Sequence, residues 1–320
     1  MKSSQQQGFT IVELLVAMGL GLTLIAGAVN VFISNNRSAM QDEQVSIMMD
    51  NGRFLSRLIS RELAMAGFWG KYLDVATIAQ DASAVVSLGN DCGDGVNPWA
   101  LDLQALQLVN NATQAAVNAN FDCLPDEIQA GTDVIAIKRV ADRETPDAAL
   151  QAGTIYMRTN GAGATMFGGT VPPVLGGTEV NWTYVPTIFY VRNYSITVGD
   201  GLPALCMATL RTVAAAPTMR NGCLVDGVED LQIEFGIDDD RDFVADHYDA
   251  APTVAEMRNA VSARIFVLAR SIAPVPNYVN DKTYNLGAKV VAPANDGFYR
   301  RVFTTTVVLR NPTNLAGVGA

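Results

Sequence analysis

Hydrophobic positions are concentrated in one long segment near the N-terminus of the chain. After a short polar stretch, residues 9–33 form a nearly unbroken apolar run that is long enough to cross a bilayer as a helix. Glu13 is the only charged residue in this run. A bare carboxylate in hydrocarbon costs about 2.5 kcal/mol or more. We therefore expect Glu13 to have a partner wherever this segment is buried.

From Ser34 the chain is more polar but keeps helical spacing. Apolar or small residues recur every three or four positions and predict one stripe along a helix: Met48, Gly52, Leu55, Ile59, Leu63 and Ala66. Charged residues are expected on its other faces: Arg53, Arg57, Arg61 and Glu62. Because no proline occurs between Phe9 and Tyr72, one helix is predicted over residues 9–66, about 85 Å long.

After Gly70 the pattern changes to short apolar runs separated by Gly, Asn, Asp and Pro. The predicted strands cover residues 101–109, 133–140, 187–192, 205–210, 231–237, 263–269 and 303–309. Residues 161–177, rich in Gly, Thr and Pro, are predicted to be a loop. The expected fold class is α+β, with the long N-terminal helix packed on a mainly antiparallel sheet head.

Composition adds two constraints. The chain has 320 residues, 49% of them hydrophobic, which is enough for a sizeable core. Its formal net charge of −10 argues against non-specific nucleic-acid binding by the body of the protein. We expect no nucleic-acid partner.

Four cysteines occur, and none is in a CxxC pair, which argues against a zinc site. If the head is exported, two disulfides are expected. The simplest pairing joins the cysteines that are closest in sequence, Cys92 with Cys123 and Cys206 with Cys223, although four cysteines allow three pairings.

Residues 1–8 do not form a complete secretory signal, because the apolar region follows Gly8 instead of preceding a cleavage site. Cleavage between Gly8 and Phe9 would leave the membrane helix on the mature chain. Lys2 precedes the apolar segment, and the next basic residue is Arg37, so the N-terminus is expected in the cytoplasm.

The segment from Gly8 through Phe9, Thr10 and Glu13 to the following LLV resembles the N-terminus of type IV prepilins. This resemblance implies that a dedicated peptidase cuts after Gly8 and methylates the new N-terminal residue, Phe9. It also implies that Glu13 pairs with the free N-terminal amine of a neighbouring subunit. The expected domains are a leader (1–8), a transmembrane or filament-core helix (9–33), its amphipathic continuation (34–70) and a globular head (71–320).

Four head segments are similar to the PilW family of type IV pilus minor pilins. They are residues 131–139 (GTDVIAIKR), 227–236 (GVEDLQIEFG), 263–271 (ARIFVLARS) and 299–311 (YRRVFTTTVVLRN). The resemblance implies a minor pilin that primes pilus assembly and lies in the tip complex. Its implied partners are other minor pilins, a tip adhesin, the major pilin, the prepilin peptidase and the inner-membrane platform. The implied location is the inner membrane before assembly, then the periplasm and the extracellular pilus tip.

An acidic segment, residues 237–248 (IDDDRDFVADHY), has the spacing of a calcium loop. The predicted oxygen ligands are at positions 1, 3, 5, 7 and 9: Asp238, Asp240, Asp242, the Val244 carbonyl and Asp246. Phe243 stands where an EF-hand loop has glycine, and position 12 lacks glutamate. A solvated acidic turn is an equal alternative, and we expect that the protein requires no cofactor. If a cation does bind, the all-oxygen ligand set favours Ca²⁺.

No catalytic constellation is recognisable, since a Ser-His-Asp triad would need the single histidine, His247, and no phosphate-binding glycine motif occurs. We therefore expect a protein that is not an enzyme. Two alternatives to the priming minor pilin stay open. One is a minor pseudopilin of type II secretion, and the other is an exposed tip adhesin module that binds through residues 75–180.

Overall fold

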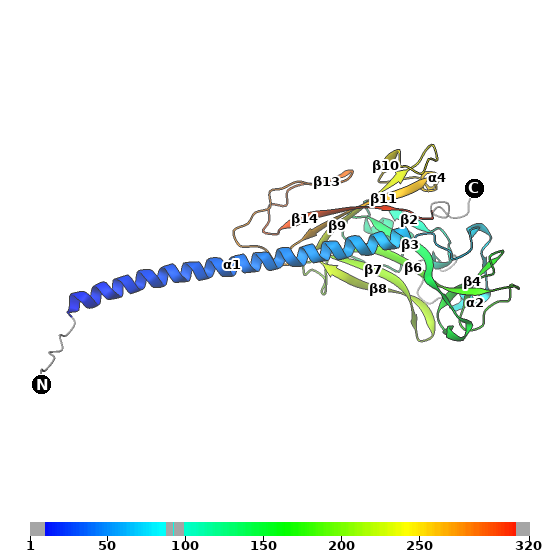
Figure 1. The fold of residues 1–320 in the computed structure, drawn as a ribbon, viewed down its shortest axis with the longest axis horizontal. Coiled ribbons are helices and arrows are strands. Elements are labelled where there is room, and N and C mark those ends of the chain that lie inside the picture. The colour runs from blue at the N-terminus through cyan, green and yellow to red at the C-terminus, as the bar shows by residue number, and fades with distance from the viewer. Residues whose placement is uncertain (1–9, 88–91, 93–98, 312–320) are drawn as a thin grey trace, which may run out of the picture.

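The structure, a computed structural model, describes residues 10–87, 92 and 99–311. Its dominant element is α1 (Ile11–Ala64), a helix of 54 residues, about 81 Å long at 1.5 Å per residue. The helix begins after the N-cap Thr10, and its C-cap Met65 precedes Gly67, which has a positive φ of 69°. Half of α1 extends away from the head as a free rod, and the other half lies along the head (Figure 1). The predicted α+β architecture is confirmed.

Within the described residues, the larger sheet has eight strands. They are β1 (Ala79–Gln80), β2 (Leu106–Val109), β3 (Val134–Thr145), β4 (Ile155–Thr159), β5 (Ala164–Gly168), β6 (Val180–Arg192), β7 (Ala204–Val213) and β8 (Ala216–Asp226). The order is β1-β5-β4-β6-β3-β2, with β7 and β8 continuing from β6, and only the β1–β5 pair is parallel.

The strand β6 organises this sheet. Its first residues pair with β4, its last six pair with β7, and its opposite edge pairs with β3. Pro186 lies between the β4-paired and β7-paired parts, where β6 has no partner on that edge. A proline lacks the N–H that a ladder needs, so this gap is the position at which β6 tolerates it.

The smaller sheet is antiparallel in the order β10-β9-β11-β14, and a hairpin forms a separate two-stranded sheet. Its strands are β9 (Val228–Ile237), β10 (His247–Asp249), β11 (Ala260–Arg270) and β14 (Arg300–Val308), and the hairpin is β12 (Tyr284–Leu286) with β13 (Lys289–Val291). Short helices occur at α2 (Ala82–Ser87), α3 (Gln114–Asn120) and α4 (Val254–Met257), with 3₁₀ turns at Val75–Thr77, Trp99–Leu101 and Asp147–Ala149.

The C-terminal half of α1 joins both sheets through one hydrophobic core. This core contains Leu55, Ile59 and Leu63 from the helix, together with residues of β6, such as Phe189, and of β9, such as Ile233. All six residues of the predicted stripe are buried. A second core, around Trp69 and Tyr190, fills the other side of the larger sheet.

Each predicted strand overlaps an observed one, but two assignments were wrong in part. Residues 101–109 are a strand only from Leu106, since Trp99–Leu101 forms a 3₁₀ turn. The segment 161–177 is not all loop, because β5 lies inside it. There Ala164, Met166 and Phe167 are buried against the neighbouring strand β4, and this packing outweighs the flanking glycines.

Candidate functional site

The N-terminal half of α1 makes no buried contact with the rest of the chain. By length and composition α1 is able to cross a membrane, and the apolar window that meets this criterion has a mean hydropathy of 2.1 with none of its residues buried. Ile11 and Leu24 are 78% and 75% exposed, and the first buried side chain along the helix is that of Met48. An all-round apolar helix is stable only where lipid or other helices cover it. This half of α1 therefore needs a partner outside its own head.

Glu13 closes the first turn of this projecting half. Its side chain accepts hydrogen bonds from the Thr10 backbone N–H at 3.0 Å and the Thr10 hydroxyl at 2.9 Å, while the Glu13 N–H donates to the Thr10 hydroxyl. This capping box satisfies two N-terminal donors of the helix. The predicted cleavage and methylation residues, Gly8 and Phe9, lie outside the described residues. The predicted contact of Glu13 with a neighbouring amine stays a prediction.

The head begins to hold α1 where a glycine removes the side chain. A Cβ atom built on Gly52 would lie 2.3 Å from an edge carbon of the Phe303 ring. The ring therefore packs directly on the helix backbone, which only glycine permits. Phe303 belongs to β14, so this contact fastens the helix to the edge strand of the smaller sheet.

Near the end of α1, Glu62, expected on a face other than the apolar stripe, forms a buried salt bridge. Glu62 is 8% exposed and accepts two hydrogen bonds from Arg139 of β3, at 2.8 and 2.9 Å. The stripe spacing did not reveal this burial, because it identifies apolar contacts only, whereas the partner arginine comes from the sheet. A bidentate pair of this kind fixes the helix rotation as well as its position.

Polar contacts secure the point where α1 leaves the head. The Gln44 side-chain oxygen accepts hydrogen bonds from the backbone N–H groups of Ile272 and Ala273, at 3.0 and 3.1 Å. The Asn51 amide donates to the Asp226 carbonyl at 3.4 Å. These bonds join the helix to the segment that follows β11 and to the last residue of β8.

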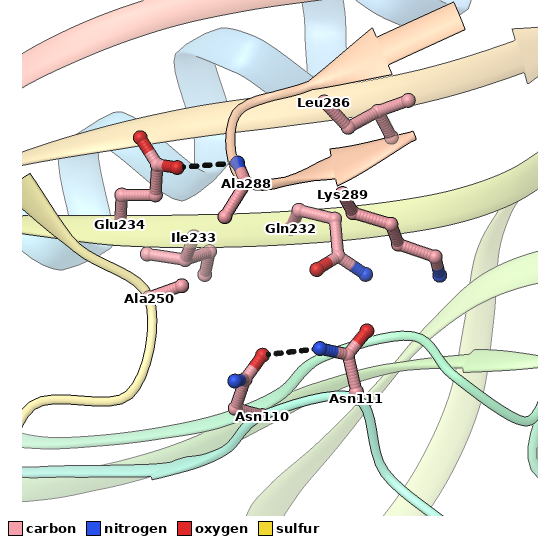
Figure 2. A pocket seen from close by; sticks show the side chains of 9 residues that line it. All are labelled: Asn110, Asn111, Gln232, Ile233, Glu234, Ala250, Leu286, Ala288 and Lys289. Atoms are coloured by element: carbon pink, nitrogen blue, oxygen red, sulfur yellow. Dashed lines mark hydrogen bonds between the residues drawn. The ribbon is translucent and has the colours of Figure 1, made fainter. Parts of the chain in front are cut away.

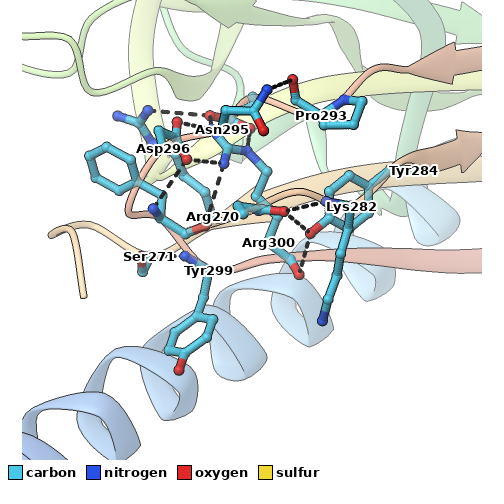
Figure 3. A network of polar contacts seen from close by, with 12 residues as sticks. Arg270, Ser271, Lys282, Tyr284, Pro293, Asn295, Asp296, Tyr299 and Arg300 are labelled. Atoms are coloured by element: carbon cyan, nitrogen blue, oxygen red, sulfur yellow. Dashed lines mark hydrogen bonds and ion pairs between the residues drawn. The ribbon is translucent and has the colours of Figure 1, made fainter. Parts of the chain in front are cut away.

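The segment 271–299, which these bonds reach, is itself held by a charged network (Figure 3). Arg300 lies between two carboxylates, with nitrogen–oxygen distances of 2.5 Å to Glu229 and 2.5 Å to Asp296. Arg270 adds a bond of 3.2 Å to Glu229. The Arg300 guanidinium holds the pKa of Asp296 below its ordinary value. The network keeps the segment above α1 in place.

The acidic loop is ordered around Asp238. This carboxylate is 4% exposed and accepts hydrogen bonds from the backbone N–H groups of Arg241, Asp242 and Phe243. Phe243 has a φ of 68°, so it takes the left-handed conformation that glycine usually supplies at this point of a calcium loop. The loop follows the expected turn in spite of its bulky residue.

Three of the four predicted aspartate ligands come together. One carboxylate oxygen each from Asp238, Asp240 and Asp246 lies within 4.8 Å of the others. Oxygens bound to one Ca²⁺ at about 2.4 Å can be at most about 4.8 Å apart, so this group fits such an ion. Asp242 is not in the group and accepts a hydrogen bond from the Val244 N–H. His247 lies 3.2 Å from Asp239.

Electrostatics of the loop agree with this crowding. The Asp242 N–H donates to the Asp240 carboxylate and lowers its pKa. The charge of Asp242, desolvation and the charges of Asp246 and Asp238 together outweigh that bond and raise the pKa of Asp240 above its ordinary value. Calcium binding itself stays a prediction.

The four cysteines form two disulfides, Cys92–Cys123 and Cys206–Cys223. Cys206 and Cys223 are directly opposed on the neighbouring strands β7 and β8. The first disulfide closes a separation of 31 residues and ties Cys92 to the turn that follows α3. This is the simplest of the three pairings that the sequence allowed.

Comparison with known proteins decides the family. Residues 188–311 match the family of type IV pilus-assembly protein W, PilW, and residues 3–29 match the prokaryotic N-terminal methylation motif. The two matches support a PilW-type minor pilin. The first match begins in β6 and includes all of the smaller sheet, and the second covers the start of α1.

Among solved structures, the chain is similar to a type IV-like pilin from Thermus thermophilus, with 11% sequence identity and a TM-score of 0.35. The similarity covers 85% of this chain and 96% of the Thermus chain. The family assignment rests on the two sequence segments. No curated protein matches the sequence.

The sequence did not reveal a second important acid of this pilin, Asp133. This fully buried residue joins the two sheets: its N–H donates to the Leu231 carbonyl of β9, and its carboxylate accepts from the N–H groups of Asn111 and Ile233, both at 2.8 Å. Burial raises the pKa of Asp133 to about 7, against the lowering effect of those two bonds.

The two residues that donate to Asp133, Asn111 and Ile233, line a pocket of about 250 Å³. The pocket lies between the β12–β13 hairpin and the turn at Asn110 and Asn111, with β9 behind it (Figure 2). Lys289 reaches across to Asp230 at 2.6 Å, and the Glu234 carboxylate accepts from the Ala288 N–H at 2.7 Å. These side chains satisfy each other and close the hairpin over the sheet. A charged residue directly before the strand run VIAIK was the only available signal for Asp133.

Proposed function

We propose that this PilW-type pilin primes assembly of a type IV pilus and lies in the tip complex with other minor pilins. The observation that carries this proposal is the contrast between a head with its own cores and a projecting apolar half-helix that its own head does not cover. A helix of this kind supplies the cohesive energy for packing into a filament, while the head contributes specificity for its neighbours.

Glu13 sets how far neighbouring helices are shifted along each other in the filament. A carboxylate and an amine are each costly alone in lipid, and they offset each other when the N-terminus of a neighbouring subunit lies beside Glu13. The capping box shows how a single chain satisfies the same carboxylate before assembly. Assembly then exchanges a contact within the chain for one between chains.

The proposed partners are the other minor pilins and a tip adhesin, together with the major pilin below them. The prepilin peptidase would act at Gly8 and Phe9, and the inner-membrane platform would extract the mature chain. The membrane anchoring that the N-terminal helix provides precedes assembly. Two disulfides in the head favour a periplasmic and later extracellular location, because such bonds persist in oxidising compartments.

The test is deletion of the gene in its own host, with surface pili, twitching motility and secretion of folded exoproteins scored in the same cells. We expect loss of pili with normal secretion. Normal pili with lost secretion would instead establish a pseudopilin of type II secretion. Complementation with the intact gene controls for effects on neighbouring genes.

A further inference from the structure

A loop at the far end of the head exposes two large apolar side chains to solvent. It connects β5 to β6, in the region around β4 at the end of the head most distant from the N-terminus of α1 (Figure 1). Val171 is 81% exposed and Val174 is 89% exposed. Among the large apolar side chains in the described part of the chain, none is more exposed than Val174.

The sequence between these valines predicts how they are presented. Pro172 and Pro173 fix their own φ angles, and each proline also restricts the residue before it to extended or polyproline II conformations. The segment has no helix or strand. A polyproline II helix has three residues per turn, so Val171 and Val174 fall on the same ridge.

The base of the loop is held by polar side chains, which range from half-buried Asn160 to nearly buried Arg158. The Asn160 amide donates to the carbonyls of Leu175 and Gly176, at 3.2 and 2.8 Å. The Glu179 carboxylate accepts from the N–H groups of the same two residues. Arg158, whose side chain is 8% exposed, binds Glu179 in turn. Its Nε atom lies 3.1 Å from a carboxylate oxygen of Glu179.

Hydrogen bonds and an ion pair therefore fix the base of a loop whose apolar tip faces solvent. Such rigidity adds nothing to a loop that only connects two strands, whereas it lowers the entropic cost of binding through the tip. Residues 168–178 carry no charge. The partner surface that matches them is consequently apolar, without a requirement for a charged pocket.

We propose that residues 171–174 are a preformed polyproline II ligand that docks into an aromatic-lined groove on another protein. Prolines and aliphatic side chains on one ridge are the features that such grooves bind. The proposal rests on the proposed function in one respect, since assembly with α1 in the filament leaves this end of the head facing the next protein toward the tip.

The test uses the full chain in its host, with a photo-crosslinking amino acid replacing Val174 in one strain and Ile196 in a control strain. Ile196 is a matched position because it is 88% exposed in a loop that Asp200 orders through backbone hydrogen bonds, yet it lacks a proline pair. Mass spectrometry then maps the residues joined to each position, and pili are counted in the same cells.

We expect the crosslinker at position 174 to form an adduct with aromatic residues of one partner. The crosslinker at position 196 should form no adduct with those residues. P172G/P173G should reduce the adduct about tenfold, because glycines remove the preformed conformation. An adduct that maps to lipid or to a surface without aromatic residues would overturn the proposal. So would equal labelling from both positions, or no adduct in cells whose pili require the chain. Failure of the proposed function is distinct, since the deletion strain would then keep its pili.

Discussion

The two halves of α1 share one helix but have opposite surroundings. From Ile11 to Ile33 apolar side chains lie on all faces, and none of the residues is buried. From Met48 to Leu63 they form a single stripe, and that stripe is buried against both sheets. The difference shows that an apolar pattern on all faces leaves a helix dependent on other molecules, while a one-sided pattern lets it pack on its own chain.

The largest expected effect comes from Glu13→Ala, which removes the only charge within residues 9–33. We expect assembled pili to be lost or nearly so, because the incoming amine then has no carboxylate in the apolar interior. Unfolding of the head in the detergent-solubilised chain should be unchanged. Pili are counted by electron microscopy, and normal piliation in this strain would contradict the assigned role of Glu13.

Glu62→Ala tests the head-bound half. It leaves the Arg139 guanidinium nearly buried without its carboxylate, and we expect a loss of about 3 to 5 kcal/mol in the free energy of unfolding. Denaturant titration followed by tryptophan fluorescence measures this, since Trp69 and Trp182 are buried in the head. Arg61→Ala is the control: its pair with Asp142 is 3.5 Å long and exposed, so it should cost less than about 1 kcal/mol. Equal effects of the two variants would show that burial does not matter here.

Glycines in the two halves permit a direct comparison. Gly52→Ala places a methyl group against the Phe303 ring, and we expect destabilisation of about 1 to 3 kcal/mol. Gly27→Ala meets no atom within 4 Å and should leave the unfolding of the head unchanged. The double variant G52A/F303L should recover part of the loss, because the smaller side chain makes room. No difference between Gly52→Ala and Gly27→Ala would mean that the ring does not rest on the helix.

Inside the head, Asp133 predicts a dependence of stability on pH. Its folded pKa of about 7 exceeds the unfolded value of about 4, so the native state holds more protons between these values. Stability should then fall as pH rises, by about 2 kcal/mol from pH 5 to pH 7. The carboxylates with lowered pKa values, such as Asp296 and Glu179, titrate below this window. Asp133→Asn should abolish the slope, and an unchanged slope would assign it to another group.

The smallest effect concerns the acidic loop. If Asp238, Asp240 and Asp246 hold Ca²⁺, a calcium concentration tenfold above Kd should stabilise the head by about 1.4 kcal/mol. Chelation should remove this gain, and it should be absent in a D240N/D246N variant. Melting curves with calcium and with chelator measure it. Identical curves for the unaltered chain would eliminate the site and leave a solvated acidic turn.

Much of the fold was predictable because its signals are local. The stripe at three- and four-residue spacing places Leu55, Ile59 and Leu63 on one face of a helix regardless of what covers them. Short apolar runs likewise identified β3, β9 and β11, most of whose residues are buried. The strand β5 was missed, since its short run lies among glycines and is a strand only through its pairing with β4 and β1.

The candidate site was predictable to a similar extent. Glu13 stands out as one charge in an apolar run, and the acidic loop stands out by its regular spacing. Asp133 and the Glu62–Arg139 pair did not stand out, because each depends on residues about 80 to 100 positions away, in another strand. A local sequence pattern does not identify a partner that lies so far away along the chain.

The sequence by itself determined that this protein has a long helix, an apolar half that requires other molecules, and a prepilin-type N-terminus. Those properties follow from composition and periodicity over short stretches, where each residue contributes independently of the fold. Only the tertiary structure decided which charges are buried, which cysteines are opposed, and which apolar side chains at the far end of the head are presented to solvent. These outcomes depend on the desolvation and packing of segments that are distant in sequence.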